Sequence, residues 1–148
     1  MKQNTNTTEN ISNNIFTAKG KSKAAAYAEL WNKAHTAGMQ AGNACIPTPM
    51  IVGTPTTVLG NDIDRTKPTY FVPSGVCGFA WVNVKDARSG FVKWLKSQNL
   101  GHKSYYGGFD IWVSEFGQSM QCKEAYARAV ASVLRDAGIK CYANSRMD

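Results

Sequence analysis

Six consecutive residues decide the fold class: Phe79-Ala80-Trp81-Val82-Asn83-Val84. Aromatic and β-branched residues fit the surface of a pleated sheet, so we expect a strand here. A similar run, Thr69-Tyr70-Phe71-Val72, precedes it, and Pro73-Ser74-Gly75 between the two has the composition of a turn. The sequence therefore predicts a β-hairpin over residues 69–84.

Downstream of this hairpin, helical and extended patterns alternate. Phe91, Val92 and Leu95 share one face of a helix that ends near Gln98, and Asp86 is the expected cap of that helix. Between residues 109 and 113 the side chains alternate with a period of two, which indicates a half-buried strand.

The last helix has the clearest pattern. Ser119 is its expected N-cap, and Gly138 supplies the left-handed residue that ends it. Apolar residues at helical spacing form its inner face: Tyr126, Val130, Val133, Leu134 and Ala137. Residues 139–143 are the expected closing strand, and residues 144–148 a polar end. The sequence thus predicts an α+β fold with helices on one small, mainly antiparallel sheet, and a ferredoxin-like strand order is one arrangement left open.

Upstream of the hairpin, Tyr27, Trp31, Ala34 and Gly38 recur at steps of three and four, which predicts a helix from about Ser22 to Gly42. The two glycines, one turn apart, indicate either close approach of another backbone or a frayed helix end. The prolines at 47 and 49 exclude further helix. Residues 50–52 are then a candidate edge strand, and residues 53–68 a long polar loop.

The composition is that of one globular domain. With 148 residues, of which 43% are hydrophobic, the chain can bury one core, and we expect a single α+β domain over residues 19–148. Residues 1–18 are rich in Asn and Thr and have little to bury, so they are expected to be a disordered tail. The sequence shows neither a membrane span nor the apolar core of a secretory signal, so we expect a cytoplasmic protein.

Motifs for metals, cofactors and catalysis are missing from the sequence. The widely spaced Cys45, Cys77, Cys122 and Cys141 form no zinc or redox motif and are expected to be core residues. No phosphate loop, dinucleotide fingerprint or nucleophile elbow is present, so we predict no metal, no cofactor and no catalytic residue.

An enzyme is the least favoured class. A Cys77 or Ser119 nucleophile would need His35 or His102 as its base. A carboxylate pair would have to come from residues such as Asp110 and Glu115, whose separation the sequence does not give.

The segment 101–108 is the most informative for binding. Lys103 can neutralise a phosphate, Tyr105 or Tyr106 can stack on a base, and Gly107 and Gly108 let a ligand approach the backbone. The alternative is an ordinary connection whose tyrosines pack back onto the core.

The start of the last helix is a second candidate for anion binding, because unpaired amides and the helix dipole attract negative charge. Simple capping by Ser119 is the alternative. Arg146 could close the site with a bidentate grip on phosphate, if helix start and loop lie at the same end of the sheet. The predicted ligand-binding residues are His102, Lys103, Tyr105, Tyr106, Gly107, Gly108, Gln118, Ser119, Lys123 and Arg146.

Seventeen Lys and Arg against ten Asp and Glu give a net charge of +7, which favours an anionic partner unless the charge serves only solubility. A DNA or RNA backbone could lie along the basic segment 85–103, although charge runs are often solvated helix faces. The residues of this alternative site are Lys85, Arg88, Lys93, Trp94 and Lys96.

Several short blocks together resemble a group of small, largely uncharacterised accessory proteins of tailed bacteriophages. The blocks are Pro47-Thr48-Pro49-Met50, Val76-Cys77-Gly78-Phe79-Ala80-Trp81-Val82, Tyr106-Gly107-Gly108, Gly117-Gln118-Ser119 and Ser145-Arg146-Met147-Asp148. The resemblance spans roughly residues 24–148. It implies a protein that neutralises a host component or acts on nucleic acid, in the host cell cytoplasm, and it assigns no functional residue.

The favoured hypothesis is a non-enzymatic phage accessory protein that binds an anionic ligand and sequesters a nucleotide signal of host defence. A DNA- or RNA-binding protein is the first alternative, and a protein inhibitor of a host defence enzyme is the second. A homo-oligomer would protect the edges of such a small sheet.

Overall fold

The computed structural model of the protein describes residues 6–148, with side chains from Lys23 onward. Three helices and six strands lie in this part of the chain: α1 (Asn6–Ala44), β1 (Met50–Val52), β2 (Tyr70–Val72), β3 (Gly78–Val84), α2 (Gly90–Ser97), β4 (His102–Lys103), β5 (Phe109–Trp112), α3 (Met120–Asp136) and β6 (Cys141–Met147). The predicted α+β class is confirmed.

The central strand of the main sheet is β3. It pairs antiparallel with β5 on one side and with β6 on the other, and β4 pairs antiparallel with β5. The strand order is therefore β4-β5-β3-β6. Combined with the chain order β3-α2-β4-β5-α3-β6, this is the split βαβ topology of ferredoxin-like folds, which the sequence had left open.

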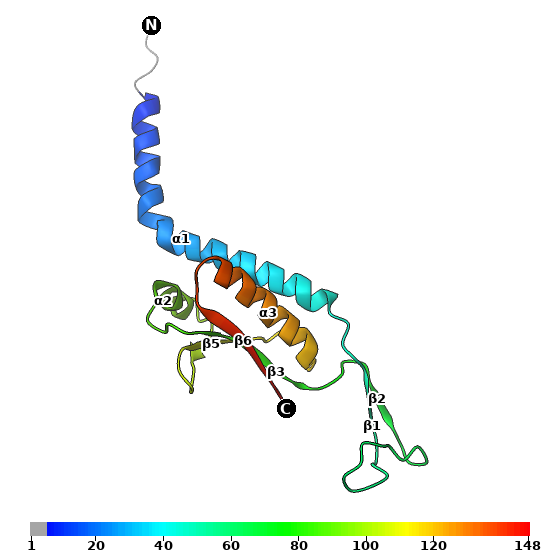
Figure 1. Ribbon diagram of the computed structural model, residues 1–148. Helices are drawn as coiled ribbons and strands as arrows, with labels where there is room; N and C mark the ends of the chain where they lie inside the picture. Colours follow the sequence, from blue (N-terminus) through cyan, green and yellow to red (C-terminus); the bar gives the residue numbers. More distant parts are fainter. Residues whose placement is uncertain (1–5) are drawn as a thin grey trace.

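The helices cover one side of this sheet, as Figure 1 shows for α3 and for α1 above it. Side chains alternate along β3, and Ala80, Val82 and Val84 point toward the helices with at most 1% of their surface exposed. Val130 and Leu134 of α3 are completely buried against the same side. The core therefore lies between the sheet and the helices.

Two glycines bring α1 close to α3. A β-carbon added to Gly38 would lie 2.6–2.7 Å from side-chain atoms of Tyr126 and Val130, and one added to Gly42 would meet the ring of Phe116. The sequence left open either close approach of another backbone or a frayed helix end at this pair. The structure shows that side chains occupy the space instead, so both glycines serve packing between helices.

The first helix begins earlier than the sequence indicated. The expected start near Ser22 is corrected to Asn6, because no proline stands in this stretch and an existing helix is easily extended by one residue at a time. The predicted disordered tail comprises residues 1–5, which lie outside the described residues, and residues 6–18, which belong to α1.

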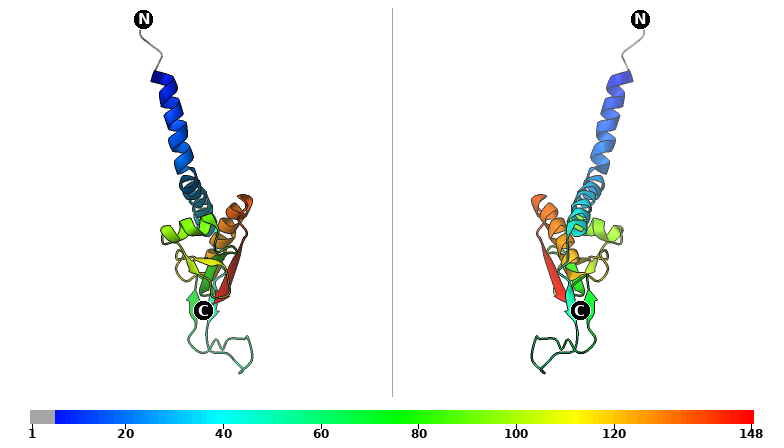
Figure 2. Two further views of the ribbon diagram at one scale, coloured as in Figure 1. Left: turned by 90° about the vertical axis from the view of Figure 1, so that its left-hand side faces the viewer. Right: turned by 90° about the vertical axis from the view of Figure 1, so that its right-hand side faces the viewer.

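The predicted hairpin over residues 69–84 is wrong. The strand β2 pairs with β1, in the register Met50↔Val72, and forms a separate two-stranded sheet. Both edges of β3 are occupied by β5 and β6, and the seven-residue pairing with β6 satisfies more backbone groups than the three residues of β2 could. The β1–β2 hairpin extends away from the main sheet (Figures 1 and 2).

The predicted helix ends agree with the structure in α3, whereas the predicted N-cap of α2 does not. Ser119 caps α3 by accepting a hydrogen bond from the Cys122 amide, and Gly138 follows the helix with φ +88°, as predicted. The N-cap of α2 is Ser89 rather than Asp86. The Asp86 carboxylate instead accepts from the Arg88 amide at 3.0 Å and shapes the turn before the helix.

Two segments taken for loops contain strands. Residues 102–103 form β4, which leads through a tight turn into β5, and the closing strand runs from Cys141 to Met147 rather than over residues 139–143. The polar side chains of residues 144–146 do not prevent strand formation, because β6 forms its hydrogen bonds to β3 through the backbone. Arg146 therefore lies in a strand and not in a free C-terminal end.

Among residues 6–148, no helix is both long and apolar enough to cross a membrane.

Candidate functional site

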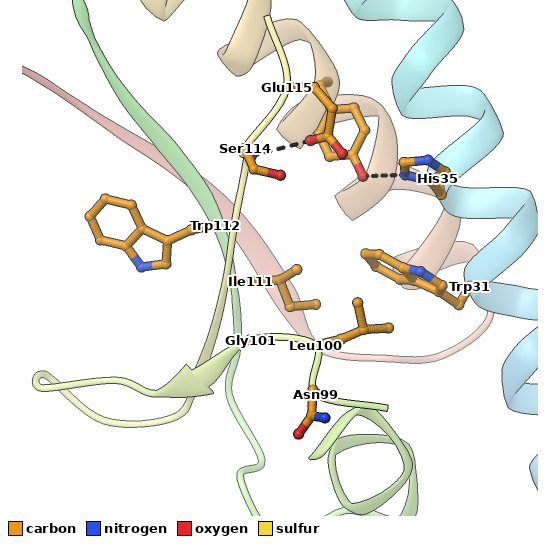
Figure 3. Close-up of a pocket in the computed structure, with 10 residues that line it drawn as sticks. Trp31, His35, Asn99, Leu100, Gly101, Ile111, Trp112, Ser114 and Glu115 are labelled. Carbon is orange, nitrogen blue, oxygen red and sulfur yellow. Dashed lines mark hydrogen bonds between the residues drawn. The ribbon is translucent and has the colours of Figure 1, made fainter. Parts of the chain in front are cut away.

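The side of the main sheet opposite the helices carries a set of aromatic and polar side chains, and we call it the open face. Figure 3 shows Trp112 on this side of β5, while Ile111 points the other way, toward Trp31 and His35 of α1. None of the helices described covers the open face. Its residues are Phe79, Trp81, Asn83, His102, Asp110, Trp112, Tyr142, Asn144 and Arg146.

Aromatic rings form a continuous cluster on the open face. Trp81 and Trp112 are directly opposite each other on β3 and β5, and their rings stack with centroids 4.9 Å apart and planes 13° apart. Phe79 meets Trp112 edge-on at 5.7 Å, and His102 stacks against the same tryptophan at 6.1 Å. The rings are only partly buried, so flat apolar surface remains available to a ligand.

Cationic groups lie against these rings. The Arg146 guanidinium is 5.4 Å from the centroid of Phe79 and 5.8 Å from that of Trp112. The Lys123 ammonium reaches Phe79 from α3 at 5.7 Å, although only 7% of this residue is exposed. Lys85 lies 5.4 Å from the ring of Tyr142 at the other end of β3. The open face thus combines rings with positive charge near both ends of β3.

Two polar side chains form a buried floor between the rings. The Asn83 amide donates to the Gly107 carbonyl at 3.0 Å and to Asp110 Oδ1 at 2.7 Å. Its own oxygen Oδ1 is buried without a hydrogen-bond partner, and so is the indole Nε1 of Trp112. Asn83 and Asp110 are 5% and 7% exposed, so both are held rigidly in the sheet.

The structure brings half of the predicted ligand-binding residues together. His102, Tyr105, Tyr106, Gly107 and Arg146 line one pocket of about 600 Å³ on the open face, together with Trp81, Asn83, Lys85, Ser104, Asp110, Trp112 and Asn144. The tyrosines are each 93% exposed, so the alternative that they pack onto the core is wrong. Lys103 is exposed in β4 beside them, and Gly108 abuts Asn83.

The start of α3 contributes less than the sequence indicated. The Ser119 hydroxyl is buried and occupied by capping, and the Gln118 carbonyl accepts from the Gly78 amide. Only Lys123 reaches the open face. The turn with Tyr105 and Tyr106 lies beside Val84 at one end of β3, and Arg146 lies opposite Phe79 near the other end. The pocket between them includes neither Gln118 nor Ser119, so the predicted convergence of the loop with the helix start is not found.

The alternative basic site is divided between two surfaces. Trp94 stacks with Phe91 at 6.1 Å and contacts Tyr27 of α1, so this ring packs against the core and does not interleave with the lysines. Lys93, Lys96 and Arg88 are exposed on or beside α2. Lys85 belongs to the pocket on the open face.

The groups that an enzyme would need are separated. His35 Nδ1 hydrogen bonds the Tyr126 hydroxyl at 2.6 Å, His102 stacks on Trp112, and Cys77 pairs with Ser119 as a backbone bridge. Asp110 and Glu115 line two different pockets. The combinations that would make a nucleophile with its base, or a carboxylate pair, are therefore not assembled.

A second pocket of about 370 Å³ lies on the helix side of β5 (Figure 3). Trp31, His35, Ile111, Glu115 and Tyr126 are among the residues that line it. Burial and the Glu115 charge raise the pKa of Tyr126, so its phenol stays protonated at neutral pH and can donate to His35. The His35 imidazole and the Tyr126 hydroxyl thus satisfy each other in this pocket.

The four cysteines are free thiols, and Cys122 and Cys141 are core residues as predicted. Cys45 and Cys77 are only partly buried. Hydrogen bonding to Cys122 and burial raise the pKa of Cys45 to about 11, which leaves its thiol protonated and poorly reactive at neutral pH.

Sequence reasoning missed most of the open face. It took Phe79 and Trp81 only as signs of a strand, and it gave no role to Asn83, Trp112 or Asn144. A signal was present, since β3 has Ala80, Val82 and Val84 at one set of alternate positions and the rings of Phe79 and Trp81 at the other. Only one of these two apolar sides can face the helices.

Comparisons with known proteins add no relative. No family model matches the chain, and neither the curated proteins nor the solved structures include a match. The resemblance to phage accessory proteins therefore stays a prediction, and the functional argument rests on the open face.

Proposed function

We propose that the protein binds single-stranded nucleic acid on its open face. The observation that carries this proposal is the cluster of Phe79, Trp81 and Trp112 on the two central strands, bordered by cations and left free by the helices described. Stacking of bases on aromatic side chains contributes about 1–3 kcal/mol per base. A cluster of partly exposed rings is a means to bind more than one base.

The charges on this face match a phosphate backbone. Lys123 and Arg146 lie beside Phe79 at one end, and Lys85 lies beside Tyr142 at the other. Phe79, Trp112 and Tyr142 are therefore each close to a cation, and the exposed Arg146 and Lys85 can neutralise a phosphate while a base stacks. The net charge of +7 attracts a polyanion in addition, so association should be fast and sensitive to salt.

The length of the face favours a chain of nucleotides over a single one. Phe79 and Lys85 are six residues apart on one extended segment, which corresponds to about 20 Å. One nucleotide cannot contact both ends, whereas a strand of several nucleotides can. The same chemistry would serve a sequestered nucleotide at the pocket beside Tyr105 and Tyr106, and the experiment below separates the two cases.

A single strand fits better than a duplex. The rings present flat surface, and bases in a duplex are stacked on one another and unavailable to it. Four-stranded sheets of βαββαβ topology can use such rings to bind unpaired bases. A phage protein that acts on nucleic acid is also one of the roles that the resemblance of the sequence implies.

The first test is binding of labelled single-stranded oligonucleotides, followed by fluorescence anisotropy, with Trp81→Ala as the variant. Removing one stacking platform should weaken binding about 5- to 150-fold, corresponding to about 1–3 kcal/mol. Tyr70→Ala is the matched control, because this tyrosine is 68% exposed on the β1–β2 hairpin and should leave affinity unchanged.

Three outcomes decide the proposal. Wild-type protein that binds no single strand, or a Trp81→Ala variant that binds as well as wild type, would overturn it. Competition by a free mononucleotide at concentrations comparable to the oligonucleotide would show instead that the face holds one nucleotide. Duplex of the same sequence should bind more weakly than either strand.

A further inference from the structure

The floor of the open face contains hydrogen-bond groups that phosphate binding does not need. Asp110 is a carboxylate with 7% of its surface exposed, surrounded on the same face by His102, Lys85 and Arg146. A negative charge here repels phosphates and so weakens binding to a nucleic acid backbone. Its position between the rings, on the strand that carries Trp112, suits a contact with a base.

The hydrogen bonds of Asn83 determine which groups are free. Both amide hydrogens are donated, one to the Gly107 carbonyl and one to Asp110 Oδ1, and a flipped amide would place its oxygen against those two acceptors. The orientation is thus fixed, and Asn83 Oδ1 remains a buried acceptor without a partner. Among the residues described, the second oxygen of Asp110 accepts no hydrogen bond from another side chain or amide.

The free groups are therefore two acceptors, Asn83 Oδ1 and the second Asp110 oxygen, and one donor, the Nε1 of Trp112. Of these three, Asn83 Oδ1 and Trp112 Nε1 are buried without a hydrogen-bond partner. Burying polar atoms without partners is unfavourable, so the retention of two such atoms in residues that line one pocket indicates a ligand that satisfies them. A partner of this floor must offer two N–H donors and one acceptor on the edge of a flat, stackable ring.

Guanine is the base with that pattern. Its pairing edge carries the N1 hydrogen and the exocyclic amino group next to each other, followed by the O6 acceptor. Adenine and cytosine offer a single amino group beside ring acceptors, and thymine or uracil offers one N–H between two carbonyls. We infer that the Asn83–Asp110 floor selects a guanine base, an inference that rests on the proposed binding of single strands by the open face.

The route to the floor passes the β4–β5 turn. Asn83 Oδ1 and Trp112 Nε1 lie beneath the molecular surface, so a base reaches them only when the side chains above them shift. His102 and Lys103 of β4 and Tyr105 and Tyr106 of the turn are exposed. Gly107, at φ +100° with open space beside it, gives the turn room to move. Displacement of His102 from Trp112 would then expose the indole nitrogen.

The test uses a short oligothymidine with one central guanine, compared with the same strand carrying adenine, cytosine, thymine or inosine at that position. Wild-type protein should bind the guanine strand about tenfold more tightly than the adenine, cytosine and thymine strands. Inosine lacks the exocyclic amino group and should fall between them. Equal affinity for all five strands would overturn the inference while leaving the proposed function intact, whereas binding to none would overturn both.

Asp110→Asn is the matching protein variant, since it keeps the shape of the side chain and removes the charge. It should lose the guanine preference and bind the all-thymine strand as well as wild type does, or better. Asn144→Asp is the control, because it adds a charge to the same face outside the floor and should keep the preference while weakening every strand alike. A guanine preference that persists in Asp110→Asn would contradict the assignment to this floor.

Discussion

The two faces of the main sheet are built from the same strands and differ in what their side chains pack against. On the helix side, Ala80, Val82 and Val84 are sealed by α2 and α3, and their contacts are complete. On the open face, Phe79 and Trp81 from the same strand contact mainly one another and Trp112. A strand that is apolar on both sides thus stabilises the fold with one side and leaves the other free to bind.

Polar groups sharpen the contrast. The helix side of β3 holds only small and aliphatic side chains, so nothing there is left without a partner. The open face holds Asn83 and Trp112, whose unpartnered buried atoms are the two found in the part of the chain that the structure describes. Buried polar atoms that lack hydrogen-bond partners on one face only are what we expect of a binding surface.

The largest change in the free energy of unfolding should come from removing a core side chain on the helix side of the sheet. Leu134→Ala removes a completely buried side chain of α3, and the cavity it leaves should lower the free energy of unfolding by about 2–5 kcal/mol. Chemical denaturation measures this change. The folded fraction should bind single strands with wild-type affinity, because Leu134 does not contact the open face. A loss of affinity without a loss of stability would contradict the separation of the two faces.

The sequence predicted the helix side well, because periodicity reports burial against a neighbouring layer. The inner faces marked by Phe91, Val92 and Leu95 in α2, and by Tyr126, Val130 and Leu134 in α3, are the buried ones. Ala137, predicted for the same face, is exposed because the helix ends there with Ala137 as its C-cap. Strand partners were not predictable in the same way. The pairing of β2 with β1, and of β3 with β6, depends on contacts between segments far apart in the chain, and no local pattern encodes them.

The same limit explains what was missed at the candidate site. The turn with Tyr105 and Tyr106 could be singled out because its residues are adjacent in sequence. The cluster of Trp81, Trp112 and Arg146 comes from three strands, and it exists only once β5 and β6 flank β3. Lys123 was predicted for a helix-start anion site, and it contacts Phe79 instead.

We expect an intermediate change in stability from a substitution in the β4–β5 turn, which lies over the open face. Gly108→Ala would place a β-carbon 2.5 Å from the Val84 carbonyl oxygen at φ +79°, so the backbone must move, and we expect a loss of stability of about 1–3 kcal/mol with weaker binding. Gly107→Ala is the control, because its φ is also positive but no atom lies within 4 Å of the added carbon. Thermal unfolding and anisotropy on both variants measure the difference. Equal effects would show that φ alone, and not the contact with β3, limits this turn.

The smallest change in stability, and the most specific change in binding, should come from Arg146→Ala. Its guanidinium lies over Phe79 and Trp112 at the surface, so its loss should cost less than about 1 kcal/mol of folding free energy. If Arg146 contacts one phosphate, the slope of log affinity against log salt should become shallower by about 0.7, the value for one contact with a single strand.

Arg128→Ala is the matched control, because Arg128 is exposed on α3 beside Glu124 and its removal should leave the slope unchanged. An unchanged slope in Arg146→Ala, with affinity lowered equally at every salt concentration, would mean that the arginine supports the rings rather than the phosphates. The open face would then bind bases without gripping the backbone at this end.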